Sequence, residues 1–183
     1  MVLSHSIDMR SKQQLVDSLD GVRDQARLNS LSLCHAGDWL NAIPSKNLDL
    51  HLDPQEFRIN ALYRLGIPVF NSPGPCIGTC RQFNDAYGDH AISCAMEGET
   101  IVRHNALRDD LHRCAITAGL TSRREVRRLL PGNDARPADV FIHRWIRRRD
   151  TAFDVTVINP LQRATVDRAA AVPGHALEVF SKD

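Results

Sequence analysis

Two acidic residues fall inside apolar segments of the C-terminal half and are candidates for binding a metal ion. Asp139 lies in the apolar run 138–145, and Asp154 lies in the apolar run 151–158. A short basic segment separates the runs, so the pattern predicts a strand hairpin with one acid on each arm. Carboxylates on neighbouring strands can share Mg²⁺ or Mn²⁺, hard cations that take oxygen ligands and assist phosphodiester hydrolysis.

These two acids also have a purely structural interpretation. Asp139 could cap the start of its strand, and Asp154 could pair with one of the many nearby arginines. A charge among apolar residues needs a partner or a bound ion, and either arrangement supplies one. The hairpin alone therefore leaves both interpretations open.

A second candidate metal site lies in segment 68–94, where Pro, Gly and Ser cluster and no periodicity is visible. Three cysteines and a histidine follow in the order Cys-x3-Cys-x9-His-x3-Cys, which supplies the ligand types of a tetrahedral zinc site. A loop of this length buries too little apolar surface to fold unaided, so a metal would order it. The alternative is scattered thiols beside a chance histidine, because the spacings are wider than usual. The candidate ligands are Cys76, Cys80, His90 and Cys94, with His104 as a spare.

Arginine is concentrated in one part of the chain. The net charge of the 183 residues is +1, but segment 103–149 holds twelve arginines, no lysine and five acids, a net charge of +7. Because guanidinium groups suit phosphate oxygens, the segment predicts a nucleic-acid partner, DNA or RNA. The alternative is a solvated basic face that balances the more acidic N-terminal half. The candidate nucleic-acid contacts are Arg103, Arg108, Arg136, Arg147, Arg148 and Arg149.

The remaining patterns place these residues in an α+β fold. Residues 1–70 are predicted to form a helical platform, with a helix that starts at Asp53, followed by Pro54, and stops at Gly66. Residues 71–98 form the predicted zinc knuckle. Residues 99–183 are predicted to contain a helix, a strand at 123–130, the hairpin and a helix at 162–171, each marked by periodicity or by turn residues.

Composition indicates a globular protein without a membrane segment. Hydrophobic residues make up 43% of the chain, mean hydropathy is -0.29, and no apolar run approaches the roughly 18–20 residues of a membrane span. The N-terminus lacks the apolar centre of a signal peptide. We therefore expect an intracellular protein with reduced thiols, placed in the nucleus if its partner is chromosomal DNA.

The order of elements and acids resembles the PD-(D/E)xK core of restriction-endonuclease-like enzymes, with a helix, three acid-bearing strands and a helix. More particularly, the Cys/His set, then Arg103-His104-Asn105, then Arg136-Pro137-Ala138-Asp139 and Asp154, resembles the C-terminal region of site-specific non-LTR retrotransposon polyproteins. In that family a zinc knuckle precedes a restriction-like endonuclease that nicks target DNA. The resemblance covers about residues 76–160.

The resemblance implies catalytic Mg²⁺ or Mn²⁺ on Asp139 and Asp154, with Glu125 as a third acid, and structural zinc on the Cys/His set. Three features depart from the family: Ala138 is an extra residue in the Arg-Pro-Asp motif, Thr156 stands where the core motif has lysine, and no Tyr-x-Asp-Asp polymerase motif occurs. The extra residue would turn Asp139 to the opposite strand face unless a bulge absorbs it.

These features predict a retrotransposon-derived protein with a DNA endonuclease domain that is shortened at its C-terminus. The alternative is a catalytically inactive, zinc-dependent nucleic-acid-binding remnant of a reverse transcriptase polyprotein. A third interpretation is a poorly folded remnant, because a sheet that lacks its last strand exposes an edge.

Overall fold

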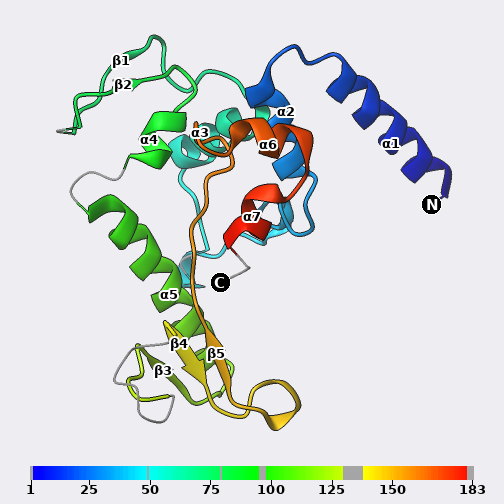
Figure 1. Ribbon diagram of the computed structural model, residues 1–183. Coiled ribbons are helices and arrows are strands. Elements are labelled where there is room, and N and C mark those ends of the chain that lie inside the picture. The colour runs from blue at the N-terminus through cyan, green and yellow to red at the C-terminus, as the bar shows by residue number, and fades with distance from the viewer. Residues whose placement is uncertain (1, 49, 79, 95–97, 130–137, 181–183) are drawn as a thin grey trace. The chain divides into compact units, whose positions relative to one another are not determined.

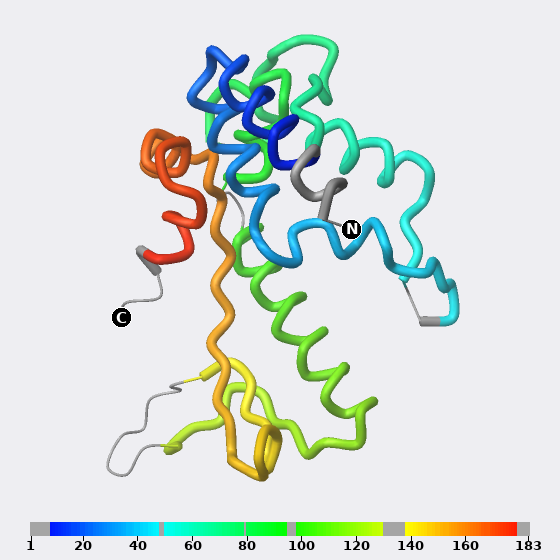
Figure 2. Tube along the Cα trace, turned by 90° about the vertical axis from the view of Figure 1, so that its right-hand side faces the viewer, coloured from blue at the N-terminus to red at the C-terminus, as the bar shows by residue number. Residues whose placement is uncertain are grey.

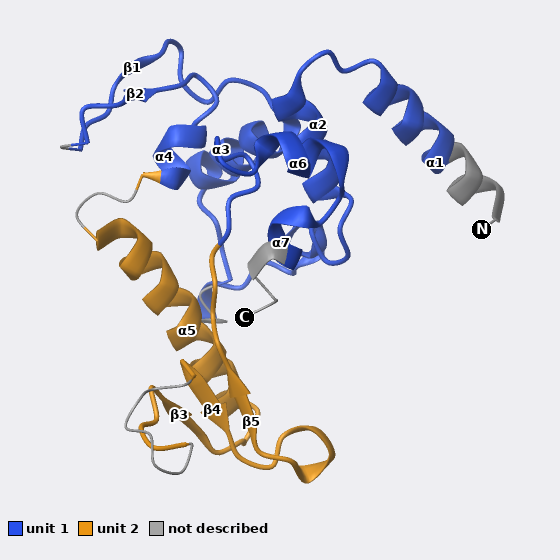
Figure 3. Cartoon of the chain, in the orientation of Figure 1, with its two compact units in different colours: residues 1–93, 158–183 blue, residues 94–157 orange. Residues whose placement is uncertain are grey.

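The computed structural model describes residues 2–48, 50–78, 80–94, 98–129 and 138–180. The chain divides into two compact units, one formed by Met1–Ser93 with Ile158–Asp183 and the other by residues 94–157 (Figure 3). Helices and short strands are mixed, so the α+β class is confirmed. Among the described residues, no helix combines the length and apolar character that a membrane crossing requires.

The first unit is mainly helical and carries one very short hairpin (Figure 1). Its elements are α1 (Val2–Asp17), α2 (Val22–Leu31), the 3-10 helices at Asp38–Asn41 and Lys46–Leu48, α3 (Pro54–Leu65), β1 (Gly74–Pro75), β2 (Phe83–Asn84), α4 (Asp89–Ser93), α6 (Val166–Ala171) and α7 (His175–Phe180).

Helix α3 begins and ends where the sequence predicts. The side chain of Asp53 accepts hydrogen bonds from two backbone N–H groups of the first turn, and Glu56 reaches back to the Asp53 N–H, which completes a capping box. Gly66 ends the helix in the left-handed region at φ 72°. A Cβ atom there would lie 2.5 Å from Arg27 Nε, so any other residue would also force the Arg27 guanidinium to move.

Helices α2 and α6 lie side by side (Figures 1 and 2) although they are far apart in sequence. Their contact uses small buried residues, Ala26 and Ala169. Asn29 Nδ2 donates to the carbonyl oxygens of Ala169 at 3.0 Å and Ala170 at 2.7 Å. Small side chains let the backbones approach closely enough for this amide to satisfy the last carbonyls of α6.

The second unit packs a three-stranded sheet against a long helix, α5 (Glu99–Thr117). Strands β3 (Ser122–Arg124), β4 (Val140–Ile142) and β5 (Thr151–Phe153) pair antiparallel in that order. Val140 and Ile142 are almost completely buried and form the centre of the core with Ala115 of α5. The core is completed by Leu111, Leu120 and Phe153.

The observed elements are shorter than the predicted ones and are grouped differently. The predicted hairpin is present, but each strand spans three residues. The predicted helix at 162–171 begins at Val166, and it packs on α2 within the first unit. The compact units separate residues 94–157 from 158–183. The predicted functional limits, 1–70, 71–98 and 99–183, stay predictions.

Replacing Asn29 by Ala should weaken the contact between α2 and α6. We expect the free energy of unfolding to fall by about 1 kcal/mol, because two partly buried carbonyl groups lose their donor. Urea denaturation followed by circular dichroism measures this change. Asn60→Ala is the matched control, since the exposed Asn60 amide donates to the Glu56 carbonyl oxygen within its own helix, α3. Equal losses in both variants would contradict the interpretation.

Candidate metal centre and acidic cluster

The four predicted ligands in the loop-rich segment lie together. One ligand atom from each of Cys76, Cys80, His90 and Cys94 lies within 4.8 Å of the others. Cys80 Sγ is 3.4 Å from His90 Nε2. All four side chains are half-buried. Three thiol groups and one imidazole at this separation could bind a metal ion such as zinc in tetrahedral geometry.

Two local elements position these ligands. Cys76 directly follows β1, and its N–H donates to the Gln82 carbonyl at 2.9 Å, so the β1–β2 hairpin carries the first two cysteines. His90 lies on α4, and Cys94 directly follows that helix. Residues four apart on a helix share one face, which brings the imidazole and the last thiol to the same side.

Asp85 organises the start of α4. Its carboxylate accepts hydrogen bonds from the N–H groups of Tyr87, Asp89 and His90 at 2.9, 3.1 and 2.7 Å. Burial would raise the pKa of Asp85, but these donors stabilise the ionised form and hold its pKa below the usual value. The sequence analysis did not single out Asp85, although Asp a few residues before a short helix is a recognisable capping signal.

A polar contact joins α4 to α2. The Arg23 guanidinium makes a two-pronged contact with the Asp89 carboxylate, and its Nη2 lies 2.9 Å from Asp89 Oδ1. The same guanidinium lies over the Tyr87 ring, 4.1 Å from the centroid. Burial and the nearby charge of Asp89 raise the pKa of Tyr63, which borders this contact. The metal-ligand helix is therefore supported by α2 through the residue next to His90.

The three predicted acids of the second unit lie at one end of the sheet. Arg124 is paired with Val140 and Val140 with Phe153, so the next residues in register are Glu125, Asp139 and Asp154. Hydrogen bonds from Glu125 N to Asp139 O, 2.8 Å, and from Asp139 N to Phe153 O, 2.9 Å, continue this register past the strands.

Asp139 and Asp154 interact with one another. Asp139 Oδ1 lies 3.1 Å from His104 Nε2 of α5, and Oδ2 accepts a hydrogen bond from Val155 N at 2.7 Å. Burial raises the pKa of Asp154, and the charge of Asp139 and a hydrogen bond to it raise it further, whereas His104 lowers it. The extra residue Ala138 therefore does not separate Asp139 from Asp154. An added cation would relieve the repulsion between these carboxylates.

Glu125 has a different environment from the other two acids. Its carboxylate makes a close ion pair with Arg108 of α5, which also contacts Asp109 at 2.9 Å. Asp109 in turn pairs with Arg124 at 2.7 Å. Hydrogen bonds from Arg108 and Arg124 lower the pKa of Asp109 to about 2. Arg108 is thus mostly buried in an ion-pair network, which limits its contact with a nucleic acid.

The Cys/His group is the one set of three or more such ligands close enough for a single ion in the part of the chain that the structure describes. The acids of the second unit supply a pair of carboxylates, with His104 beside Asp139. A hard cation at that pair would complete its shell with water and substrate oxygens, as Mg²⁺ commonly does.

The predicted nucleic-acid contacts fall into separate places. Arg103 is half-buried, and its Nη2 lies 3.4 Å from the Cys94 carbonyl oxygen. Arg147, Arg148 and Arg149 are exposed on the turn between β4 and β5. Arg147 and Arg148 have φ values of 53° and 59°, a left-handed conformation that costs an L-residue about 1 kcal/mol or more. Arg136 lies outside the described residues.

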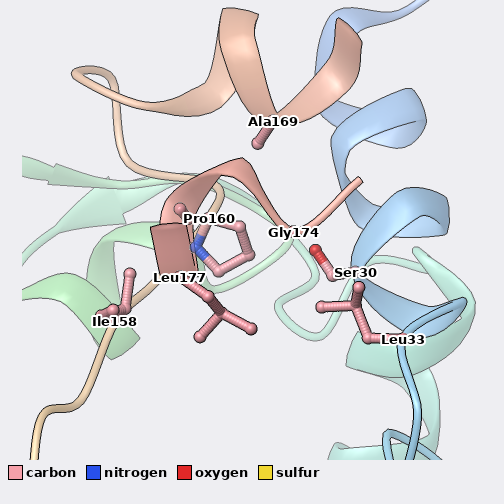
Figure 4. A pocket seen from close by; sticks show the side chains of 8 residues that line it. Ser30, Leu33, Ile158, Pro160, Ala169, Gly174 and Leu177 are labelled. Carbon is pink, nitrogen blue, oxygen red and sulfur yellow. The ribbon is translucent and has the colours of Figure 1, made fainter. Parts of the chain in front are cut away.

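An apolar cavity of about 170 Å³ lies in the first unit among α2, α6 and α7 (Figure 4). Leu33, Ile158, Pro160 and Leu177 contribute to its wall. Its one hydroxyl, that of Ser30, donates to the Ala26 carbonyl oxygen at 2.8 Å. The cavity therefore presents no group for catalysis.

Comparison of the chain with family models, with characterised proteins and with solved structures gives no significant match. The interpretation of both sites consequently depends on their geometry and on the resemblance of the motifs.

Replacing Asp154 by Asn should stabilise the protein at neutral pH when no Mg²⁺ is added. The raised pKa means that native Asp154 holds its proton to higher pH than the unfolded chain, whose value is near 3.8. Stability of the parent therefore falls as pH rises through this window, and Asn removes the penalty. Urea midpoints from pH 3 to 7 test the sign: the advantage of the variant should shrink toward low pH.

Asp110→Asn is the matched control for this measurement. Asp110 is exposed and pairs with Arg113 one helical turn away, at 2.7 Å. It should show no gain at pH 7. A lower midpoint for Asp154→Asn than for the parent at pH 7 would mean that Asp154 has a favourable partner in the native state.

Proposed function

We propose that this chain is a retrotransposon-derived protein whose second unit is a metal-dependent DNA endonuclease that nicks phosphodiester bonds. The observation that carries the proposal is the meeting of Asp139 and Asp154 at one end of the sheet, with His104 beside Asp139. Paired carboxylates on adjacent strands are the arrangement that the resemblance to PD-(D/E)xK enzymes requires. Basic side chains on the same unit favour a nucleic-acid substrate.

The residues fit a divalent cation of the Mg²⁺ or Mn²⁺ type. Asp139 and Asp154 would hold it through carboxylate oxygens, and the raised pKa of Asp154 indicates a carboxylate pair that a cation would stabilise. Such an ion supplies a Lewis acid for the phosphate and lowers the pKa of bound water. The hydrogen bond from Val155 N and the contact with His104 orient Asp139 for this role.

The Cys/His group is proposed to be a structural zinc site. Four protein ligands leave no open position for a substrate, which is the pattern of structural rather than catalytic zinc. The hairpin β1–β2 and the five-residue helix α4 are too small to form a core of their own. Zinc would therefore order the segment from Cys76 to Cys94.

We expect the purified protein to contain one zinc ion per chain. His90→Ala should lose the metal and unfold at lower temperature, because three thiolates remain without the imidazole that closes the site. Inductively coupled plasma mass spectrometry and the visible spectrum of the Co²⁺-substituted protein measure this. His51→Ala is the matched control, since His51 is exposed and distant in sequence from the ligands. Full zinc content in His90→Ala would refute the site.

Nicking of supercoiled plasmid in Mg²⁺ or Mn²⁺ tests the nuclease. Asp139→Asn and Asp154→Asn should each lower the nicking rate by about 100-fold or more, because each replaces a negatively charged metal-binding carboxylate by a neutral amide. Asp110→Asn should retain the parental rate. Equal cleavage by the parent and both variants would indicate a contaminating nuclease and would overturn the proposal.

A second candidate function is nucleic-acid binding without cleavage. It is favoured by the close pairing of Glu125 with Arg108, which ties the third acid to a cation, and by Thr156 in the position of the motif lysine. Salt-dependent binding of duplex DNA without nicking would identify this function. Binding of structured RNA in preference to DNA would identify an RNA partner. Nicking of chromosomal DNA, or binding to it without cleavage, would place the protein in the nucleus.

A further inference from the structure

We infer that the turn 144–149 binds the phosphate backbone of duplex DNA at a distance from the carboxylate pair, and thereby positions the duplex along the hairpin. The inference rests on the proposed DNA partner and deepens it. Four of the six residues in this turn are arginine. The turn and the acids lie at opposite ends of the β4–β5 hairpin, within one compact unit.

The guanidinium groups of the turn make no ion pair within the part of the chain that the structure describes. Arg144, Arg147, Arg148 and Arg149 are all exposed, and across the described ranges no carboxylate forms an ion pair with any of them. Arginines elsewhere in the unit are of two kinds: Arg108, Arg113 and Arg124 each have an acidic partner, whereas Arg123 and Arg127 are exposed and form no ion pair with a described carboxylate. The turn therefore carries the densest group of arginines without an acidic partner among the described residues of this unit.

The one acid beside the turn shapes the backbone instead of neutralising an arginine. Asp150 Oδ1 accepts a hydrogen bond from Arg144 N at 3.0 Å and lies 2.6 Å from His143 Nδ1. Trp145 N donates to the Arg149 carbonyl oxygen at 2.9 Å, which closes the turn. The Asp150 carboxylate thus contacts a backbone N–H and a histidine, and the four guanidinium groups of the turn remain available to bind an external anion.

The backbone conformation indicates that these side chains do not serve the turn itself. Arg144, Arg147 and Arg148 have φ values of 50°, 53° and 59°. Glycine or asparagine adopts this left-handed conformation more readily and would close the turn without crowding four positive charges. Strain of this kind is typical of segments that bind a ligand. Their side chains therefore contribute to binding rather than to folding.

The turn is held rigidly enough to act as a contact surface. The Trp145 ring packs against Phe153 of β5 with ring centroids 4.8 Å apart, and Phe153 belongs to the core around Val140. Because Trp145 is anchored in this way, the guanidinium groups extend from a fixed hairpin end rather than from a loose tail. Fixed cations lose less entropy when they bind phosphates.

The hairpin length sets the spacing between the two contacts. Strand β4 ends at Ile142, three residues after Asp139, and an extended strand rises roughly 3.4 Å per residue, or about 10 Å over that stretch. Duplex DNA rises about 3.4 Å per base pair on each strand, so the turn would contact phosphates at least about three base pairs from the carboxylates. Phosphate contacts at that distance orient a duplex without reading its sequence.

Equilibrium binding of a fluorescent 30-base-pair duplex to the full-length, zinc-loaded protein tests this inference. No Mg²⁺ or Mn²⁺ is added, so the measurement does not depend on cleavage. The variant R147N/R148N removes two charges but retains a residue type that tolerates the left-handed conformation. We expect its Kd to be about tenfold higher near 0.1 M salt and the slope of log K against log salt to be smaller by about 1.8. Its melting temperature should equal or exceed that of the parent.

R58Q/R113Q is the charge-matched control, with both changes on exposed helical positions. It should bind duplex within about twofold of the parent. Equal losses in the two variants, or parental binding by R147N/R148N, would overturn the inference while the DNA partner remained. A parent that binds vesicles containing phosphatidylserine but not the duplex would show that the turn faces a membrane. A parent that binds neither would overturn the proposed function itself.

Discussion

The pairing register of β3, β4 and β5 is the constraint on which the candidate chemistry depends. Two backbone hydrogen bonds beyond the strands keep Glu125, Asp139 and Asp154 in adjacent positions. Successive strand residues point to opposite faces, so a one-residue slip would move Asp139 away from Asp154 and would also expose Val140 and Ile142. Burial of these two core residues against Ala115 therefore stabilises the register that brings the acids together.

The segment that carries the Cys/His ligands, residues 76–94, depends on a different interaction, because it has almost no apolar core. Asp85 fixes the start of α4, and Arg23 ties Asp89 to α2, yet these contacts are polar and partly exposed. Such contacts orient the ligands but stabilise the fold only modestly. A metal bound by four side chains would supply the missing stability, which is why the ligand set and the fold of this segment are interdependent.

Local signals in the sequence were sufficient for some of these features. The capping box of α3 and the Cys/His set could be predicted because each depends on residue types at short spacing. The hairpin was predictable from two apolar runs, but its strands are short because the residues near the turn are exposed. The packing of α6 on α2 was not predictable, since it depends on Asn29 and small residues 140 positions apart. The pairing of Arg108 with Glu125 likewise required the fold to bring α5 beside β3.

The basic segment of the sequence does not act as one surface. Near the acids, Arg108 and Arg124 join Asp109 and Glu125 in a network whose charges largely cancel. At the far end of the hairpin, the arginines of the turn pair with no described carboxylate. A nucleic acid would therefore meet a partly neutralised arginine network beside the carboxylates, where phosphate repulsion is greatest, and unneutralised positive charge at the turn. In the proposed function, affinity and chemistry would be separated along one hairpin, so nucleic-acid binding would persist in a chain whose acids no longer held a catalytic ion.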